Sequence, residues 1–228
     1  MWIDDQILKQ FHKTLHAEIF VPQTTCVVLG SGNDEVLEVN LEACQERSIS
    51  VMRRYGGGGT VVLYPGCVVV SLGCWVKEQF QNTLYFRLIN QAVINSLGAA
   101  WQNLNDLSQA GISDITMGDK KIAGTSLFRS RNYLLYQASL LVALDRELVN
   151  GVLRHPTKEP DYRQGRSHGE FLTSLMTAEP TISSPTQVAR ELKNNFHDVV
   201  IKILGDHLIE PIAEQAPALT ARLERSQC

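Results

Sequence analysis

The sequence has few of the features that mark disulfide-rich proteins, proteins with structural metal sites, and nucleic-acid-binding proteins. Its 228 residues include five cysteines, an odd number, and no C-x-x-C pair. Neither a disulfide framework nor a structural zinc site is therefore expected, and reduced, mostly buried thiols are the simpler interpretation. Lysine and arginine total 21 against 24 acidic residues. A general nucleic-acid-binding protein would carry a basic excess, so no nucleic-acid partner is expected.

Long apolar runs are also missing. No stretch reaches the roughly 18 apolar residues that a transmembrane helix needs, so no membrane association is predicted. The first five residues contain two acids, Asp4 and Asp5, and no basic residue. This is not the pattern of a secretory signal, and we expect a cytoplasmic protein. The length suits one domain, or one domain with a small appendage.

The spacing of apolar residues predicts alternating helices and strands. Apolar positions recurring every three or four residues predict helices over residues 4–16, 41–45 and 84–101. The apolar, β-branched runs at 61–63 and 68–72 read as two strands joined by a turn at 64–66. Residues 134–144 have Tyr, Leu and Val on both sides of Ser139, which favours a strand. Further strands are predicted at 26–29, 49–53, 114–116 and 121–123.

A change of composition at residues 179–185 precedes a well-marked helix. Ser184 can cap it, Pro185 suits its first position, and Gln187 completes a capping box. Gly205 is a suitable end. We therefore expect a main domain over residues 1–180 and a small helical extension over 181–228. The apolar stripe of the helix comprises Val188, Leu192, Phe196, Val199 and Ile203.

Four consecutive glycines follow two arginines in the segment 53–60. Such a run costs chain entropy, and it is useful where the backbone adopts positive φ angles or approaches a ligand closely. Successive N–H groups form a cradle for carboxylate or phosphate oxygens, and Arg54 adds a planar fork of donors. The segment is neither a G-x-x-x-x-G-K-[ST] loop nor a G-x-G-x-x-G helix start. By composition alone, a flexible hairpin loop is an equally good interpretation.

A second candidate site surrounds Lys121, which lies on a predicted strand close to Gly124. A lysine held in a pocket can neutralise charge on a phosphate or a developing oxyanion. Asp114, on the preceding strand, could face the same pocket and hold Mg²⁺ that bridges nucleotide phosphates. Taken alone, this segment is more often a solvated hairpin with surface lysines.

The two segments together, 53–61 and 118–124, strongly resemble the catalytic domain of lipoate–protein ligases. Octanoyltransferases and biotin ligases share that fold. The resemblance also includes Glu38-Val39-Asn40, Asp114 and residues 166–175, and so spans most of residues 1–175. It implies an α+β fold, with a central mixed, largely antiparallel β-sheet flanked by helices.

The resemblance implies ATP-dependent activation of lipoate, or octanoate, followed by transfer to a lysine of an acceptor protein. ATP and Mg²⁺ would be the cofactors, lipoate the substrate, and Lys121 the catalytic residue. Asp114 would be associated with the nucleotide and its Mg²⁺, while Val28, Val61 and Val69 are candidates for lining an apolar slot. The residues that would bind lipoate and the adenylate are Arg54, Gly57, Gly58, Gly59, Gly124 and Thr125.

Some positions depart from the family pattern and keep alternatives open. Ser113 stands where the family has asparagine, Gln137-Ala138 where it often has His-Gly, and Cys67 where an asparagine is expected. Octanoyltransferases of this fold use a cysteine downstream of the lysine motif. Here the only cysteine after Lys121 is the last residue, Cys228. The lack of a cysteine at the expected place favours adenylation over transfer through a thioester. An octanoyl or lipoyl transferase and a non-catalytic lipoate-binding module remain the alternatives, with a biotin ligase below them.

Partners follow from the same resemblance. A lipoyl-acceptor domain is expected. The predicted extension is shorter than the accessory domain of two-domain bacterial ligases, so either a separate accessory subunit or a self-sufficient short form is implied. The loop at 155–168 carries Lys158, Arg163 and Arg166. These would meet an acidic acceptor or nucleotide phosphates, or would simply be solvated.

Overall fold

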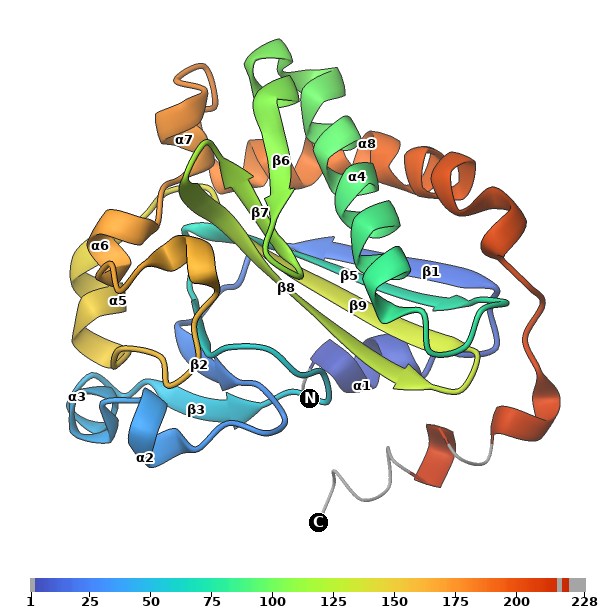
Figure 1. Cartoon of the computed structure of the whole chain (residues 1–228), viewed down its shortest axis with the longest axis horizontal. Coiled ribbons are helices and arrows are strands. Elements are labelled where there is room, and N and C mark those ends of the chain that lie inside the picture. The colour runs from blue at the N-terminus through green and yellow to red at the C-terminus, as the bar shows by residue number, and fades with distance from the viewer. Residues whose placement is uncertain (1–2, 217–218, 222–228) are drawn as a thin grey trace.

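The structure, a computed structural model, describes residues 3–216 and 219–221 and contains two β-sheets (Figure 1). The large sheet has six strands in the order β1-β5-β9-β8-β7-β6, all neighbours antiparallel, and the small sheet has the order β3-β2-β4. In the small sheet β2 pairs with β3 in parallel and with β4 in antiparallel fashion. The predicted α+β fold with a mixed, largely antiparallel sheet is confirmed. The strands are β1 Leu15–Phe20, β2 Cys26–Leu29, β3 Ser50–Arg53, β4 Val61–Leu63, β5 Cys67–Trp75, β6 Leu107–Ala110, β7 Asp114–Met117, β8 Lys120–Ser130 and β9 Tyr133–Leu141.

Helices cover the large sheet on both faces. Alternate residues of β5, such as Val70 and Leu72, face a core shared with α4 (Asn82–Ala100) and α8 (Pro185–Leu204). The intervening residues face the other way, where Trp75 packs against α1 (Ile3–Leu8). Val69, on this second face, packs against strands of the small sheet. The small sheet and α1 therefore lie opposite α4 and α8. The remaining helices are α2 Glu35–Glu38, α3 Leu41–Glu46, α5 Arg146–Val152, α6 His168–Phe171 and α7 Leu175–Ala178.

Helix α8 begins and ends as the sequence predicts, with one difference. Pro185 is its first residue, and the Ser184 hydroxyl accepts a hydrogen bond from the Gln187 N–H at 3.2 Å. The Gln187 side chain, however, accepts from the N–H of Ser183 rather than of Ser184. The helix stops before Gly205, which has a positive φ of 21°. The apolar stripe of α8 joins the core that lies against the large sheet. The division into a main domain over residues 1–180 and an extension over 181–228 stays a prediction.

The helix predicted over residues 4–16 is wrong beyond Leu8. Helix α1 ends there, and Leu15 begins strand β1, where it pairs with Cys74 of β5. The helical spacing of Leu15 was a coincidence, because backbone pairing with a buried strand overrides local propensity. The strand predicted at 134–144 is confirmed as β9, whereas β6 and α5 were not predicted. Strand β8 is eleven residues long, much longer than the predicted 121–123.

The cysteines of the described part of the chain behave as packing residues. Cys26, Cys44, Cys67 and Cys74 are buried free thiols. Burial raises the pKa of Cys67 and of Cys74 to about 12, so both thiols are neutral and unreactive at ordinary pH. Cys228 lies outside the described residues.

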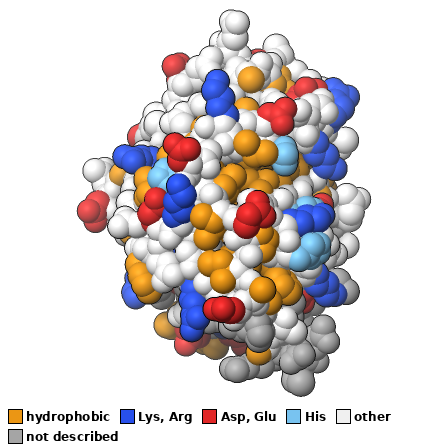
Figure 2. Space-filling view, turned by 90° about the vertical axis from the view of Figure 1, so that its right-hand side faces the viewer, with side chains coloured by type: hydrophobic (Ala, Val, Ile, Leu, Met, Phe, Trp, Pro, Cys, Tyr) orange, Lys and Arg blue, Asp and Glu red, His pale blue; other side chains and the backbone are white. Residues whose placement is uncertain are grey.

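The surface at the right-hand side of Figure 1 is shown in Figure 2, where hydrophobic side chains gather near the middle with basic and histidine side chains around them. A groove between β1 and α8 is lined by apolar residues such as Leu15 and Phe196, with Lys13 and Lys193 also on its walls. In the part of the chain that the structure describes, no helix is long and apolar enough to span a lipid bilayer.

Candidate functional site

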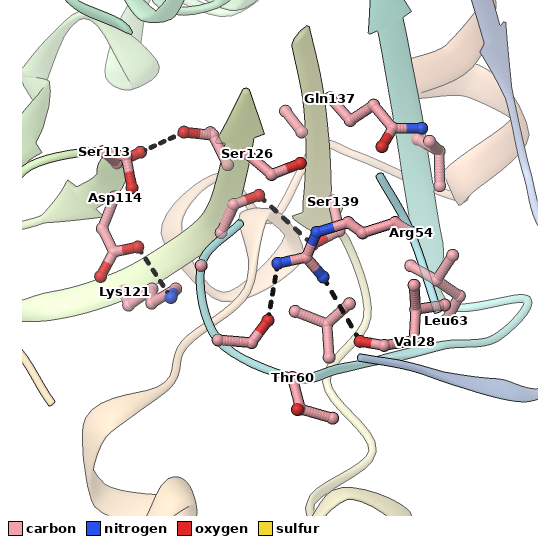
Figure 3. A pocket seen from close by; sticks show the side chains of 17 residues that line it. Val28, Arg54, Thr60, Leu63, Ser113, Asp114, Lys121, Ser126, Gln137 and Ser139 are labelled. Carbon is pink, nitrogen blue, oxygen red and sulfur yellow. Dashed lines mark hydrogen bonds and ion pairs between the residues drawn. The ribbon is translucent and has the colours of Figure 1, made fainter. Parts of the chain in front are cut away.

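A cleft between the two sheets brings the two sequence motifs together (Figure 3). It holds about 620 Å³ of empty space, including the part open to solvent. The glycine run reaches it from the end of β3, and Lys121 reaches it from β8. Segments far apart in the sequence thus form one site, as the pairing of the motifs predicted. Of the eight predicted site residues, seven line this cleft: Arg54, Gly58, Gly59, Asp114, Lys121, Gly124 and Thr125.

Arg54 is buried, with 7% of its surface exposed, and its guanidinium is bound to its own loop. Nη2 donates to the carbonyl oxygens of Gly57 at 2.7 Å and Gly59 at 2.8 Å, and Nη1 donates to that of Val28 at 3.3 Å. Gly57, which does not line the cleft, contributes this carbonyl. Burial lowers the pKa of Arg54 to about 10, although the negative charges of Asp4 and Glu38 act to raise this pKa. Arg54 is therefore a cation at neutral pH that fixes the shape of the glycine loop.

Glycine is required at particular positions around this loop. Gly58 has a φ of +94°, a conformation that residues with a Cβ rarely adopt. A Cβ at Gly30 would lie 2.0 Å from the carbonyl oxygen of Gly58, so the two backbones are in close contact. At Gly57 and Gly59 an added Cβ would meet no atom within 4 Å. Of the four glycines in the run, Gly58 therefore has a strict backbone requirement, Gly57 and Gly59 are sterically open, and a Cβ at Gly56 would lie 3.0 Å from Ser126 Oγ.

The charged end of the cleft is built on the β7–β8 hairpin. Lys121 Nζ lies 2.7 Å from Asp114 Oδ1, so these two side chains face one pocket as predicted. A Cβ at Gly124 would lie 3.3 Å from Lys121 Nζ, so the lysine passes close to the backbone at this position. The Thr125 hydroxyl donates to the carbonyl of Ser113 at 2.5 Å and ties β8 to the start of the hairpin.

The other end of the cleft is apolar. Val28 and Val61 of the small sheet and Val69 of β5 line it, as predicted, together with Leu63. Behind them the same cluster continues with Cys26 of β2 and other apolar side chains. A cleft with an apolar slot at one end and a lysine at the other suits an amphiphilic carboxylic acid.

Two buried carboxylates that sequence reasoning did not assign to the site support its loops. Glu38 accepts hydrogen bonds from the Thr60 hydroxyl and from Thr157 Oγ1 at 3.0 Å. Asp4 is fully buried and accepts from the Tyr55 N–H at 2.9 Å and from Gln137 Nε2 at 2.7 Å. The resemblance pointed to Glu38 through the E-V-N stretch, but no pattern in the sequence distinguishes Asp4.

The 155–168 loop packs against the protein. Arg166 Nη1 lies 2.6 Å from Asp119 Oδ2, at the turn of the β7–β8 hairpin. Arg163, whose side chain is 5% exposed, pairs with Glu159 at 3.3 Å and lies over the ring of Phe171. The solvated-loop interpretation is therefore wrong for these two arginines, while Lys158 is exposed.

Asp114 is the one carboxylate among the cleft-lining residues, and its chemistry fits Mg²⁺ in a nucleotide site. Such ions usually bind one or two carboxylates together with substrate phosphates and water. Among residues 3–216 and 219–221, no group of three or more histidine, cysteine or acidic side chains could hold a metal by itself. Any Mg²⁺ here would thus depend on phosphate oxygens from a bound nucleotide.

Comparison with known proteins identifies the family. Residues 1–197 match the model of the lipoyl protein ligase A/B catalytic domain, and the chain belongs to this family. Lipoate-protein ligase A subunit 1 of Thermoplasma acidophilum is 31% identical over 140 residues, covering 58% of this chain and 53% of that protein. An inactive lipoate–protein ligase 2 of Plasmodium falciparum is 27% identical over 183 residues, covering 66% of this chain and 47% of that protein. The chain therefore spans about half the length of these relatives.

Solved structures confirm the fold. A bi-partite lipoate protein ligase from T. acidophilum, studied with its E2 lipoyl domain, superposes with a TM-score of 0.71 at 23% identity, covering 96% of this chain and 84% of that one. A lipoate-protein ligase A bound with ATP gives a TM-score of 0.69 at 24% identity, covering 96% of this chain and 86% of that one. At these identities the likeness establishes the fold, and the chemistry has to be argued from the cleft itself.

Proposed function

We propose that this chain is an ATP-dependent lipoate–protein ligase, which activates lipoate or octanoate as the acyl-AMP and transfers the acyl group to a lysine of an acceptor protein. The observation that carries the proposal is the single cleft in which an apolar slot leads to Lys121 and the glycine loop. The slot suits the acyl chain, and the charged end suits the carboxylate and the phosphates of a nucleotide.

In the first step the substrate carboxylate attacks the α-phosphate of ATP, and pyrophosphate leaves. The carboxylate is already a nucleophile, so the protein mainly aligns it and stabilises negative charge. Lys121 supplies a compact cation for the carboxyl and the α-phosphate. Mg²⁺ bound at Asp114 would add positive charge beside the phosphates. The cleft-lining residues proposed to bind lipoate and the adenylate are Arg54, Gly58, Gly59, Gly124 and Thr125, and Gly57 is proposed to support them through its carbonyl, which accepts from Arg54.

In the second step the ε-amine of an acceptor lysine attacks the carbonyl carbon of the mixed anhydride, and AMP leaves with the electrons of the broken C–O bond. The acceptor is proposed to be a lipoyl domain, as in the system that contains the bi-partite T. acidophilum ligase. That ligase also supports the proposal of a separate accessory subunit for this chain.

An octanoyl or lipoyl transferase of the same fold is the second candidate. The human mitochondrial lipoyl amidotransferase is 24% identical over 231 residues, covering 99% of this chain and 58% of that protein. The four described cysteines argue against a cysteine acyl carrier, because they are buried. The inactive relative from P. falciparum favours a third candidate, a binding module without chemistry.

One experiment separates these candidates. The purified chain is incubated with an apo lipoyl domain and either lipoate, Mg²⁺ and ATP, or octanoyl carrier protein without ATP. Pyrophosphate release and the mass of the lipoyl domain are then measured. The ligase proposal predicts pyrophosphate and an added lipoyl group only with ATP. Transfer from the carrier protein without ATP would favour the transferase, and lipoate binding without either product would favour the binding module.

Lys121→Ala is expected to lower pyrophosphate release at least 100-fold, because the cation at the reacting carboxyl and phosphate is lost. Lys120→Ala is the matched control, since Lys120 precedes Lys121 on the same strand and is exposed. Equal rates in the two variants would contradict the role of Lys121.

A further inference from the structure

Tyr162 makes a contact with the site that neither the motifs nor the comparisons assign. It lies in the short turn Asp161–Arg163 of the 155–168 loop, and its hydroxyl donates to Asp114 Oδ2 at 2.8 Å. The other oxygen of Asp114, Oδ1, lies 2.7 Å from Lys121 Nζ. The carboxylate of Asp114 therefore lies between the phenol and the ammonium, with one oxygen toward each.

The ring of Tyr162 packs against a neighbouring aromatic side chain. It packs against Phe171 with 5.2 Å between ring centroids. The backbone at Gly111 is also near the ring, since a Cβ added there would lie 3.5 Å from a ring carbon of Tyr162. The hydroxyl is thus presented by a fixed ring rather than by a freely rotating side chain.

Arg166 joins the backbone of this turn to the hairpin that carries Asp114 and Lys121. Its Nη2 donates to the carbonyl of Tyr162 at 2.8 Å and to that of Asp119 at 3.0 Å. The turn and the hairpin are therefore connected beside the charged end of the cleft, and Tyr162 and Asp114 are held in register.

The second hydrogen bond to Asp114 matters because a carboxylate turns easily about its terminal bond. Asp114 is 9% exposed, so an oxygen without a donor would be costly to leave there. Without the phenol, the carboxylate would turn both oxygens toward Lys121 and draw the ammonium away from a ligand.

We propose that Tyr162 is a positioning residue that acts through Asp114 to hold the Lys121 ammonium where the acyl carboxylate and the α-phosphate meet. This role rests on the proposed ligase function. It gives the 155–168 loop a defined task in the first chemical step, separate from contact with an acceptor.

The kinetic test compares Tyr162→Phe with Tyr64→Phe in pyrophosphate release from ATP and lipoate. Both changes remove one hydroxyl from a packed ring. The Tyr64 hydroxyl donates to the Ala143 carbonyl at 2.8 Å and accepts from the Asp145 N–H at 3.0 Å, and Tyr64 does not line the cleft. For Tyr162→Phe we expect kcat to fall about 10-fold, the size of one hydrogen bond to a charged group, with the KM for lipoate within about twofold of wild type. Tyr64→Phe should keep wild-type kcat.

Two kinetic outcomes would overturn the proposal. An unchanged kcat in Tyr162→Phe would show that the hydroxyl has no positioning role. The same loss in both variants would indicate general destabilisation instead of an effect on Lys121.

A measurement without substrate keeps this test separate from the proposed function. The chain is labelled with ¹³Cζ-tyrosine, and the Tyr162 signal is identified by its loss in Tyr162→Phe. In Asp114→Ala this signal should shift upfield while the Tyr64 signal stays in place. If the Tyr162 signal does not move, the contact with Asp114 is absent and the proposal falls. If the wild type releases no pyrophosphate, the ligase proposal fails, and with it the positioning role, whatever the NMR signal shows about the contact.

Discussion

The two cations of the cleft are held in opposite ways. Arg54 is buried and directs its guanidinium at backbone carbonyls of its own loop and of β2. Lys121 is partly exposed, with 22% of its side chain accessible, and pairs with the side chain of Asp114. The difference indicates a division of labour. Arg54 mainly maintains the fold of the glycine loop, whereas Lys121, held on one side by Asp114, keeps part of its side chain accessible to a ligand.

Arg54→Met is expected to have the largest effect on the free energy of unfolding. This change leaves three carbonyl groups without their donor, that of Val28 in a buried region and those of Gly57 and Gly59 in a partly buried one. We expect the free energy of unfolding to fall by about 3 kcal/mol or more, as for other buried charged groups that lose their partners. Urea denaturation followed by circular dichroism measures it.

Lys121→Ala is the matched variant for this measurement. Its loss should be about 1 kcal/mol or less, because partly exposed ion pairs contribute little. Similar losses of stability in the two variants would contradict the proposed division between them.

Two neighbouring positions of the glycine loop, Gly58 and Gly57, are expected to differ in how much stability an alanine costs. Gly58 has a φ of +94° and an added Cβ would lie 3.2 Å from Arg54 Nη2. We expect a loss of about 1–2 kcal/mol for Gly58→Ala from backbone strain and contact with Arg54. At Gly57 an added Cβ meets nothing within 4 Å, so Gly57→Ala should change the free energy of unfolding by less than about 1 kcal/mol. Thermal or urea unfolding of the pair measures the difference, and equal losses would refute it.

The smallest expected effect concerns Gly124. A Cβ there would lie 3.3 Å from Lys121 Nζ, so the flexible end of the lysine has to shift by a few tenths of an ångström. Gly124→Ala should therefore lower kcat for pyrophosphate release a few-fold with little loss of stability. Steady-state kinetics with varied lipoate tests this, and a variant with unchanged kcat would show that the position of Lys121 tolerates the shift.

The sequence predicted those site residues that belong to a recognisable motif and missed those that do not. Gly58 and Lys121 belong to segments with recognisable spacing, and the cleft does bring them together. Asp4 and Tyr162 gave no such signal, because long-range contacts that only the folded chain creates join them to the site.

The fold shows the same limit. The strongly periodic α4 and α8 and the apolar strand β9 were predicted within a few residues. The edge strand β1 was missed because its pairing with β5, rather than its own pattern, determines its conformation.

The most direct test of the account is lipoate-dependent exchange of labelled pyrophosphate into ATP, measured for the wild type and for Lys121→Ala. This exchange reports formation of the acyl-adenylate without any acceptor protein. We expect the wild type to show exchange that requires lipoate, and Lys121→Ala to lose this exchange while remaining folded. Exchange at the wild-type rate in Lys121→Ala would contradict the central role given to this lysine.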